Sequence, residues 1–576
     1  MTARDPITLE LIKNALSSLV DEMAYTVIQT AHSEIVKDVM DFSTACCDAQ
    51  GRMLAQGKTI AMHLGAVPEA MEAVQAEFAG DINPGDVFTL NDPYEGGMHL
   101  QDVFIIKPVF TGETLAGWMV AVAHQTDMGG RVPGSNASDS TEIYQEGIRI
   151  PPLKLYDRGE RNDTIIRFMH KNVRVPGRVL GDWGSQLAAC SLGEKSYLEL
   201  VEKYGLEVLD DYFSALLDYS EQMMRAEISA WPDGSYEFTD YLDGDGFDET
   251  PIPIKVTLHI DGDSLVADYT GSGEQVTGAI NSTLSFTNSC TYLSVRCMIR
   301  EDIPNNAGVF RPITIKAPEG TIVNVVSPGA VAARAATGYR IVDAMFGALA
   351  QIVPDRVPAA GEGGNTVASL SGRREDRSPF IVVDMLCGAW GGRPNADGVD
   401  AVTNPSQNMS NTPIEVLEAQ HPVRVERYGL VRDTAGAGRF RGGMAISRQY
   451  RMLNEGGGLL QLRSDRSHHA PWGLEGGRPG HVSLNFLLEG DEEKPLPNKV
   501  TMSIPKGTGV RHQMAGAGGF GDPLERDPGA VLEDVLDDRI SREFARREYG
   551  VVIDGDAIDE QATSALRDAG GAASGA

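Results

Sequence analysis

The stretch 91–102 constrains the fold around it more than any other part of the sequence. It combines a turn signal at Asp92-Pro93, a glycine pair at 96–97, and then His99 followed three residues later by Asp102. Strand-forming residues occupy 103–106, so an imidazole and a carboxylate stand at the entry to a predicted β-strand. Residues of these two types suit a borderline-to-hard divalent metal ion.

A second apolar segment, 117–123, ends in His124, and Asp127 follows it. Two predicted strands therefore carry His at their ends, and the two ends can converge on one ion. The alternative is that each His only forms hydrogen bonds in a polar strand end, because a short H-x-x-D motif often occurs by chance.

Length and composition limit the class of protein. A chain of 576 residues is too long for one ordinary core, so we expect two to four domains or lobes. With 42% hydrophobic and 23% charged residues it is typical of a soluble globular protein, and its net charge of −31 argues against a nucleic-acid or anionic-membrane partner. The 64 glycines and 30 prolines predict many tight turns, including turns at 442–443 and 518–519.

The sequence also predicts the compartment. No apolar run approaches the roughly 20 residues that span a bilayer, and the first six residues lack a signal-peptide core. The six cysteines form no C-x-x-C pair, which favours reduced thiols over disulfides or a cysteine-ligated zinc. We therefore expect a cytoplasmic location and no membrane association.

The order of predicted elements favours an α+β class: a multi-lobed chain with mixed and antiparallel sheets, packed helices and many loops. Long helical periodicity covers 6–31 and 186–228, and shorter helical patterns cover 67–78, 281–300, 338–352 and 526–549. Strand patterns cover 44–48, 52–56, 86–90, 236–241, 254–260 and 264–269, and much of 425–510. Residues 128–150 predict a long loop beside the site.

These patterns predict five parts of the chain. They are an N-terminal α/β lobe with the metal site (1–230), a central α+β lobe (231–425), a β-rich and glycine-rich lobe (426–525), a helical arm (526–563) and a flexible tail (564–576).

Several familiar chemistries are missing from the sequence. It has no G-x-x-x-x-G-K phosphate loop, no H-E-x-x-H motif and no G-x-S-x-G motif. The G-x-G-x-x-G at 516–521 is followed by Asp522-Pro523 and not by a helix, which argues against a dinucleotide site. If ATP takes part in the reaction, we expect another chain to bind it.

A set of motifs in fixed order resembles the hydantoinase B family, also called the oxoprolinase B-type family. The resemblance covers roughly residues 5–530 and rests on Asp41-Phe42-Ser43, Asn91–Tyr94, Gly96–Asp102, Ala123-His124, Asn305–Pro312, Arg340–Asp343, Gly436–Gly443, Pro471–Leu474 and Gly518–Pro523. Met98 and Gln101 depart from the usual family pattern, so they leave the substrate open.

The resemblance implies an A-type partner chain that binds ATP and activates a lactam, a cyclic amide or a ketone enolate. It implies a heterotetramer or larger hetero-oligomer, in which this chain completes the reaction at a divalent metal. Carried over position by position, the metal ligands would be Asp41, His99, Asp102 and His124. Four N/O ligands favour zinc, and manganese or iron remain open.

Such a metal lowers the pKa of bound water towards about 7, giving a hydroxide that attacks an activated lactam, or it polarises the lactam carbonyl as a Lewis acid. Asp38, Glu34 or Asp127 could orient that water or move a proton, although a solvated carboxylate is favoured for each. His63 belongs either beside the ligands or in the packing. Three arginines, 311, 340 and 441, could bind a carboxylate or phosphate, although structural ion pairs are favoured.

Three functions remain open. The first is the metal-bearing B-type (β) chain of an ATP-dependent cyclic amide hydrolase acting on a lactam, a hydantoin or 5-oxoproline. The second is the metal-bearing chain of an ATP-dependent ketone carboxylase. The third is a non-catalytic chain in which a metal only links two strands.

Overall fold

The computed structural model describes residues 5–570 apart from 64, 301, 365 and 403. The chain forms two compact units, each assembled from separate stretches. Unit 1 contains Met1–Thr239, Ile254–Ala348 and Pro405–Pro413, and unit 2 contains Asp240–Pro253, Leu349–Asn404 and Ile414–Ala576. Residues 231–425 thus contribute to both units, and the five-part division stays a prediction.

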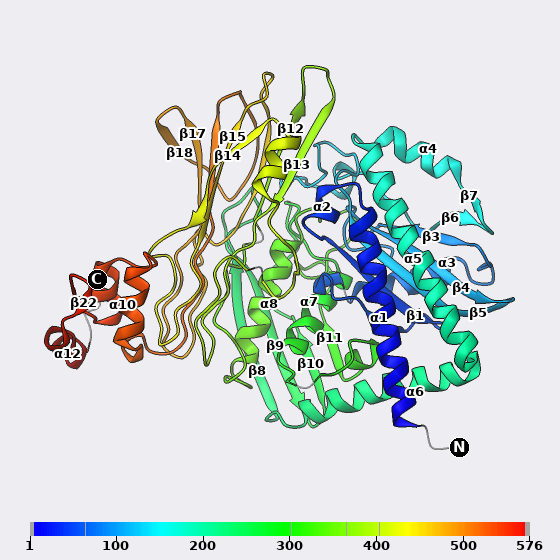
Figure 1. Ribbon diagram of the computed structural model, residues 1–576, viewed down its shortest axis with the longest axis horizontal. Helices are drawn as coiled ribbons and strands as arrows, with labels where there is room; N and C mark the ends of the chain where they lie inside the picture. Colours follow the sequence, from blue (N-terminus) through cyan, green and yellow to red (C-terminus); the bar gives the residue numbers. More distant parts are fainter. Residues whose placement is uncertain (1–4, 64, 301, 365, 403, 571–576) are drawn as a thin grey trace. The chain divides into compact units, whose positions relative to one another are not determined.

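Unit 1 is built around a seven-stranded antiparallel sheet with the order β2-β1-β5-β4-β3-β6-β7 (Figure 1). Its strands are β1 (Phe42–Asp48), β2 (Met53–Gln56), β3 (Val87–Leu90), β4 (Asp102–Thr111), β5 (Thr114–His124), β6 (Leu153–Asp157) and β7 (Glu160–Arg161). The predicted hairpin is β1 with β2. Strand β5 pairs with β1 on one side and β4 on the other, so the polar ends of the three strands lie close together.

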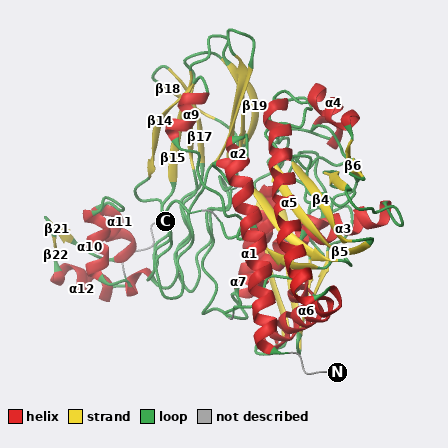
Figure 2. Ribbon diagram, turned by 45° about the vertical axis from the view of Figure 1, so that its right-hand side comes forward, coloured by secondary structure: helices red, strands yellow, loops and turns green. Residues whose placement is uncertain are grey.

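Two long helices pack beside this sheet, α1 (Pro6–Thr30) and α5 (Pro176–Tyr204) (Figure 2). Helix α1 begins where the sequence predicts, because the Asp5 carboxylate accepts hydrogen bonds from the N–H groups of Ile7 and Thr8, and Pro6 occupies the first turn. Its apolar residues at helical spacing, such as Leu16 and Val20, are fully buried. The remaining helices before residue 230 are α2 (Glu34–Lys37), α3 (Ala66–Glu77), α4 (Asp163–Asn172) and α6 (Leu206–Ile228).

The other elements centred on unit 1 are a four-stranded sheet, order β11-β10-β9-β8, and two helices. They are β8 (Gly234–Leu242), β9 (Ile252–Asp261), β10 (Ser264–Asp268), β11 (Ile313–Lys316), α7 (Leu284–Cys297) and α8 (Ala335–Leu349). The predicted hairpin of β9 with β10 is present. Short 3-10 turns occur at Ala61–His63, Ile143–Gln145 and Ala307–Phe310, and the second of them lies inside the predicted loop 128–150.

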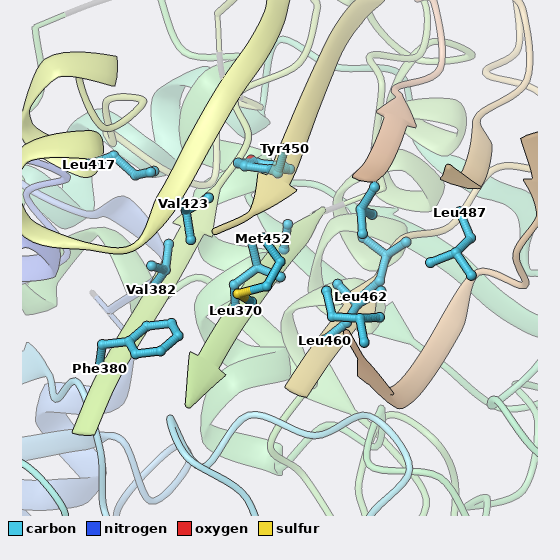
Figure 3. Packing of buried hydrophobic residues seen from close by; sticks show 13 residues of the cluster. Leu370, Phe380, Val382, Leu417, Val423, Tyr450, Met452, Leu460, Leu462 and Leu487 are labelled. Atoms are coloured by element: carbon cyan, nitrogen blue, oxygen red, sulfur yellow. The ribbon is translucent and has the colours of Figure 1, made fainter. Parts of the chain in front are cut away.

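Unit 2 holds two larger sheets with a shared apolar core (Figure 3). The first, β13-β12-β16-β19, contains β12 (Val367–Arg373), β13 (Pro379–Met385), β16 (Gly458–Arg463) and β19 (Lys499–Ile504). The second, β14-β15-β20-β17-β18, contains β14 (Val423–Leu430), β15 (Ile446–Met452), β17 (Leu484–Glu489), β18 (Glu492–Pro495) and β20 (Gly509–Gln513). Leu370 and Leu460 of the first sheet share a buried cluster with Tyr450 and Leu487 of the second, and α9 (Ile414–Gln420) adds Leu417.

Glycine-rich extended segments form a layer of unit 2 that lies outside the regular strands. This glycine-rich layer consists of residues 388–392, 434–443, 471–480 and 515–521, several of which run side by side as orange and yellow segments in Figure 1. Backbone hydrogen bonds link the segments directly, for example from Gly436 N to Ala517 O at 2.8 Å and from Gly392 N to Gly518 O at 2.8 Å. A Cβ at Gly442 would overlap the carbonyl oxygen of Ala517.

The glycine pairs at 442–443 and 518–519 therefore do not serve the tight turns that the sequence predicts. None of the four adopts the left-handed backbone conformation for which turns select glycine. Instead they lack a side chain because neighbouring backbones approach too closely to leave room for one.

The C-terminal part of unit 2 is helical, as predicted for 526–549. It contains α10 (Pro528–Leu536), α11 (Arg542–Tyr549) and α12 (Glu560–Asp568), with the two-stranded β21 (Ile553–Asp554) and β22 (Ala557–Ile558). The tail predicted from residue 564 starts too early, because α12 continues to Asp568, and residues 571–576 lie outside the described part. No helix in the described ranges is long and apolar enough to cross a membrane, and the cytoplasmic location stays a prediction.

Candidate metal centre

The register of the central strands brings polar side chains to one edge of the unit 1 sheet. Asp102, the first residue of β4, pairs directly with His124, the last residue of β5. On the other side of β5, Phe42 of β1 pairs with Ala123, and the N–H of His124 donates to the carbonyl of Asp41 at 3.0 Å. His99 joins them from the turn that precedes β4, where the N–H of Asp102 donates to its carbonyl at 3.1 Å.

Three of the four predicted ligands form a compact group, which we call the triad: His99, Asp102 and His124. One ligand atom from each lies within 4.8 Å of the others, and all three residues are buried. Nδ1 of His99 is 2.8 Å from Oδ2 of Asp102, and Nδ1 of His124 is 3.5 Å from Oδ1. The two imidazole rings are 4.9 Å apart between centroids.

Two buried atoms of the triad have no hydrogen-bond partner in the described structure: Nδ1 of His99 and Oδ1 of Asp102. Nδ1 of His99 approaches Oδ2 of Asp102 at 2.8 Å, an oxygen that already accepts a hydrogen bond from Arg334. An unsatisfied buried polar atom costs about 1–3 kcal/mol, and a divalent cation satisfies a nitrogen and a carboxylate oxygen at once. The donor set therefore fits a metal ion.

The protonation states of His99 and Asp102 suit the binding of a cation. Burial, and then the neighbouring Arg334 guanidinium, lowers the pKa of His99 well below its ordinary value, so the imidazole is neutral at pH 7. Burial raises the pKa of the Asp102 carboxyl, but the positive charge of Arg334 opposes that rise, and the pKa lies well below its usual range, so the carboxylate is ionised. A neutral imidazole and a charged carboxylate are the forms that bind metals.

Asp41, the fourth predicted ligand, lies beside the triad and is not part of it. Its Oδ2 is 3.7 Å from Nδ1 of His124, and its Oδ1 is 3.8 Å from Nε2 of His63. Burial raises the pKa of the Asp41 carboxyl, and His124 and His63 oppose that rise. His63 is itself buried and is held by Ser43, whose Oγ is 2.9 Å from Nδ1. The structure thus places His63 next to Asp41, at the margin of the candidate site.

The predicted proton-transfer carboxylates lie in different settings. Asp38 is half-buried at the end of α2 and makes no hydrogen bond or ion pair with the triad among the described residues; burial and then Glu34 raise its pKa. Glu34 is bound by Arg178 at 2.7 Å. Asp127 is fully buried and accepts hydrogen bonds from the N–H groups of Gly134 and Arg174 and from the Arg174 guanidinium, which favours a structural role for it.

Arg334 is the residue at the site that sequence reasoning missed. Its Nη2 donates to Oδ2 of Asp102 at 2.5 Å, and its guanidinium lies 4.2 Å from the ring centroid of Phe286. The only local signal is a single charge within the small apolar run 330–336. The arginines singled out from the sequence form structural ion pairs, as favoured: Arg311 with Asp218 and Glu221, Arg340 with Asp343, and Arg441 with Asp534.

Comparison with known proteins decides the family. The family model described as hydantoinase B/oxoprolinase matches residues 5–523. This chain belongs to that family. The family resemblance seen in the sequence motifs is therefore confirmed. A relative from Pseudomonas sp. strain NS671, named as the B-type chain of a D-/L-hydantoinase, is 35% identical and the match covers 98% of each chain.

The solved structures confirm the α+β fold class. The ATP-dependent caprolactamase of Pseudomonas jessenii matches with a TM-score of 0.92 and 31% identity, over 98% of this chain and 100% of the other. A nucleotide-free acetone carboxylase matches with a TM-score of 0.91 over 98% of this chain and 83% of the other. At 20% identity the second likeness shows the fold alone.

Proposed function

We propose that this chain is the metal-bearing B-type component of an ATP-dependent hydrolase of cyclic amides. The observation that carries the proposal is the buried triad with an unsatisfied imidazole nitrogen and an unsatisfied carboxylate oxygen. The family supports the reaction class, because the relatives include the B-type chain of a hydantoinase and the β-chain of a caprolactamase. Lactams and hydantoins are both cyclic amides.

In this proposal His99, Asp102 and His124 hold a divalent metal, and Asp41 either completes the ligand set or accepts a proton beside it. Two imidazoles and carboxylates favour zinc, while manganese and iron remain compatible with the same ligands. When bound, such an ion supplies Lewis acidity and an activated water. The family name does not tell which ring is opened, so a lactam, a hydantoin and 5-oxoproline are all candidate substrates.

The neighbouring residues have separate tasks. His63 orients the Asp41 carboxylate, since the two side chains approach to 3.8 Å in a buried setting. Asp38 is the candidate for proton transfer at a partly exposed position, where burial and then Glu34 raise its pKa. Asp127 orders the loop after β5 through Arg174 and the Gly134 N–H, and so supports His124 three residues away.

We further propose that ATP is bound by an A-type partner chain and that the two chains form a heterotetramer or a larger assembly. The names of the hydantoinase and caprolactamase relatives support a partner, since each is named as one component of a larger enzyme. The sequence also lacks a phosphate loop of the Walker type. A carboxylase function is the alternative, and the acetone carboxylase likeness supports only its fold.

The test is to reconstitute the chain with its A-type partner and assay ATP-dependent opening of caprolactam, hydantoin and 5-oxoproline. We expect His99→Ala and Asp102→Ala to lose both bound metal and ring opening. His170→Ala is the matched control, because His170 is exposed at the end of α4. Full hydrolysis by either triad variant with the metal removed would refute the catalytic site. Consumption of bicarbonate with ATP would instead establish the carboxylase alternative.

A further inference from the structure

The two oxygens of Asp102 have different surroundings. Oδ2 accepts a hydrogen bond from Nη2 of Arg334 at 2.5 Å and also lies 2.8 Å from Nδ1 of His99. Oδ1 has no hydrogen-bond partner in the described structure and faces Nδ1 of His124 at 3.5 Å. The guanidinium therefore takes one oxygen of the carboxylate and leaves the other available.

Arg334 is itself held firmly. Its guanidinium lies over the ring of Phe286, and its side chain is only 4% exposed. The backbone that carries it is tied down by Glu146, whose Oε1 accepts hydrogen bonds from the N–H groups of Val331 at 2.7 Å and Ala332 at 2.8 Å. The N–H of Arg334 then donates to the carbonyl of Val331 at 3.0 Å. One carboxyl group on the loop after β5 thus fixes the turn that presents the arginine.

Apolar packing joins this turn to the triad. Leu100, between His99 and Asp102, shares a buried cluster with Ile143, Val325 and Val331. The cluster therefore connects the ligand turn, the Glu146 loop and the arginine turn within unit 1. A packed support of this kind lets a buried guanidinium keep one orientation towards a carboxylate.

We propose that Arg334 reserves Oδ1 of Asp102 for the metal by holding Oδ2, and that Glu146 is the positioning residue that keeps Arg334 in place. The inference rests on the proposed function, since it assumes that the triad holds a metal ion. An Asp102 restricted to one oxygen occupies one coordination position, so it leaves another position open for water or substrate. Without Arg334 the carboxylate is free to turn and offer both oxygens.

The test measures metal binding by the purified chain, with Zn²⁺ for affinity and Co²⁺ for its visible absorption spectrum. We expect Arg334→Met to weaken Zn²⁺ binding about 10–100-fold, the usual cost of losing a residue that supports a metal ligand. We also expect the Co²⁺ absorption to fall, because a carboxylate bound through both oxygens raises the coordination number. Arg334→Lys keeps a cation and should give an intermediate affinity, and it serves as the test if the Met variant fails to fold.

Arg441→Met is the matched control, since Arg441 also pairs with a buried aspartate, Asp534, and both residues belong to unit 2. It should leave the Co²⁺ spectrum unchanged. Glu146→Gln keeps an oxygen acceptor for the two N–H groups and should bind metal as the wild type does, whereas Glu146→Ala should shift towards the behaviour of Arg334→Met. Wild-type metal binding by Glu146→Gln would show that the hydrogen-bond acceptor at this position matters for holding Arg334.

The outcomes separate the two proposals. If the wild-type chain binds no metal, or if His99→Ala binds it normally, the proposed function fails and this inference fails with it. If His99→Ala loses the metal while folded Arg334 variants match the wild type in affinity and spectrum, only the role of Arg334 is overturned. Equal behaviour of Glu146→Ala and Glu146→Gln would overturn the role of Glu146.

Discussion

In unit 1, strand pairing brings side chains together, whereas in the glycine-rich layer of unit 2 the backbones approach because side chains are missing. At the triad, antiparallel register places Asp102 opposite His124, and buried polar atoms remain without partners in the described structure. In the glycine-rich layer, N–H and C=O groups satisfy each other directly, as from Gly436 to Ala517. Unsatisfied buried atoms indicate a binding site, while mutually satisfied backbone indicates a structural role.

The two regions should therefore respond to different changes. Removing a side chain at the triad should abolish metal binding and leave most packing intact. Adding a single methyl group in the glycine-rich layer should damage packing and leave the chemistry of the triad intact. Comparing the two types of variant separates the contribution of each region.

The largest expected effect comes from His99→Ala. We expect ATP-dependent ring opening by the reconstituted enzyme to fall by about 10³-fold or more, because loss of a metal ligand removes several kcal/mol of transition-state stabilisation. Metal content should fall in parallel, while the far-UV circular dichroism spectrum of the chain stays unchanged. Retained activity at stoichiometric metal would show that His99 is not a ligand.

The next largest effect is on stability, from Gly442→Ala. A Cβ there would overlap the carbonyl of Ala517, and overpacking of this kind costs about 1–3 kcal/mol or more. Denaturant unfolding measures the loss, and zinc affinity of the folded variant should match the wild type. A stability equal to that of the wild type would show that the layer has room that its backbone spacing does not indicate.

Some of this architecture follows from sequence because its causes are local. Asp5-Pro6 and the apolar spacing after it determine α1, and the His-x-x-Asp spacing at 99–102 identifies two triad members. Arg334 could not be predicted, because it lies 232 residues from Asp102 and only the tertiary fold brings the two together.

The glycine pairs show a different limit of sequence analysis. Glycine permits both a left-handed turn and a close backbone approach, and the two uses look alike in a sequence. At 442–443 and 518–519 the close approach is the actual reason, which becomes visible only when the facing carbonyls are placed. Asp127 is comparable, since its setting beside Arg174 favours a structural carboxylate where the sequence suggested a proton carrier.

The buried carboxyl of Glu146 should make the stability of unit 1 depend on pH. Burial raises the pKa of this carboxyl from 4.5 to about 8, with Tyr94 and Arg334 as its charged or titratable neighbours. Between these pH values the unfolded chain releases the proton of Glu146 and the folded chain keeps it. The destabilisation that Glu146 causes therefore grows as the pH rises and levels off above pH 8. The Glu146→Gln variant has no proton to release here, so it lacks this pH-dependent destabilisation.

We therefore expect the stability of Glu146→Gln, relative to the wild type, to increase between pH 5 and pH 6.5 by roughly 2 kcal/mol. Denaturant midpoints at several pH values measure the difference. Glu142→Gln is the control, because Glu142 lies on the same loop and is exposed. A difference that stays constant across this range would show that Glu146 is already ionised in the folded chain.

The smallest expected effect is a gain in stability, opposite in sign to the effect of Gly442→Ala. Gly184 lies within α5, is exposed, and has open space where a Cβ would be placed. Gly184→Ala should stabilise the chain by about 0.5–1 kcal/mol, since alanine loses less conformational freedom in a helix. Gly205 also has open space but adopts φ +79°, so Gly205→Ala should destabilise through backbone strain by roughly 1 kcal/mol. Thermal melting curves of the two variants test this. Equal shifts in melting temperature would show that backbone conformation has no effect on stability separate from the effect of available space.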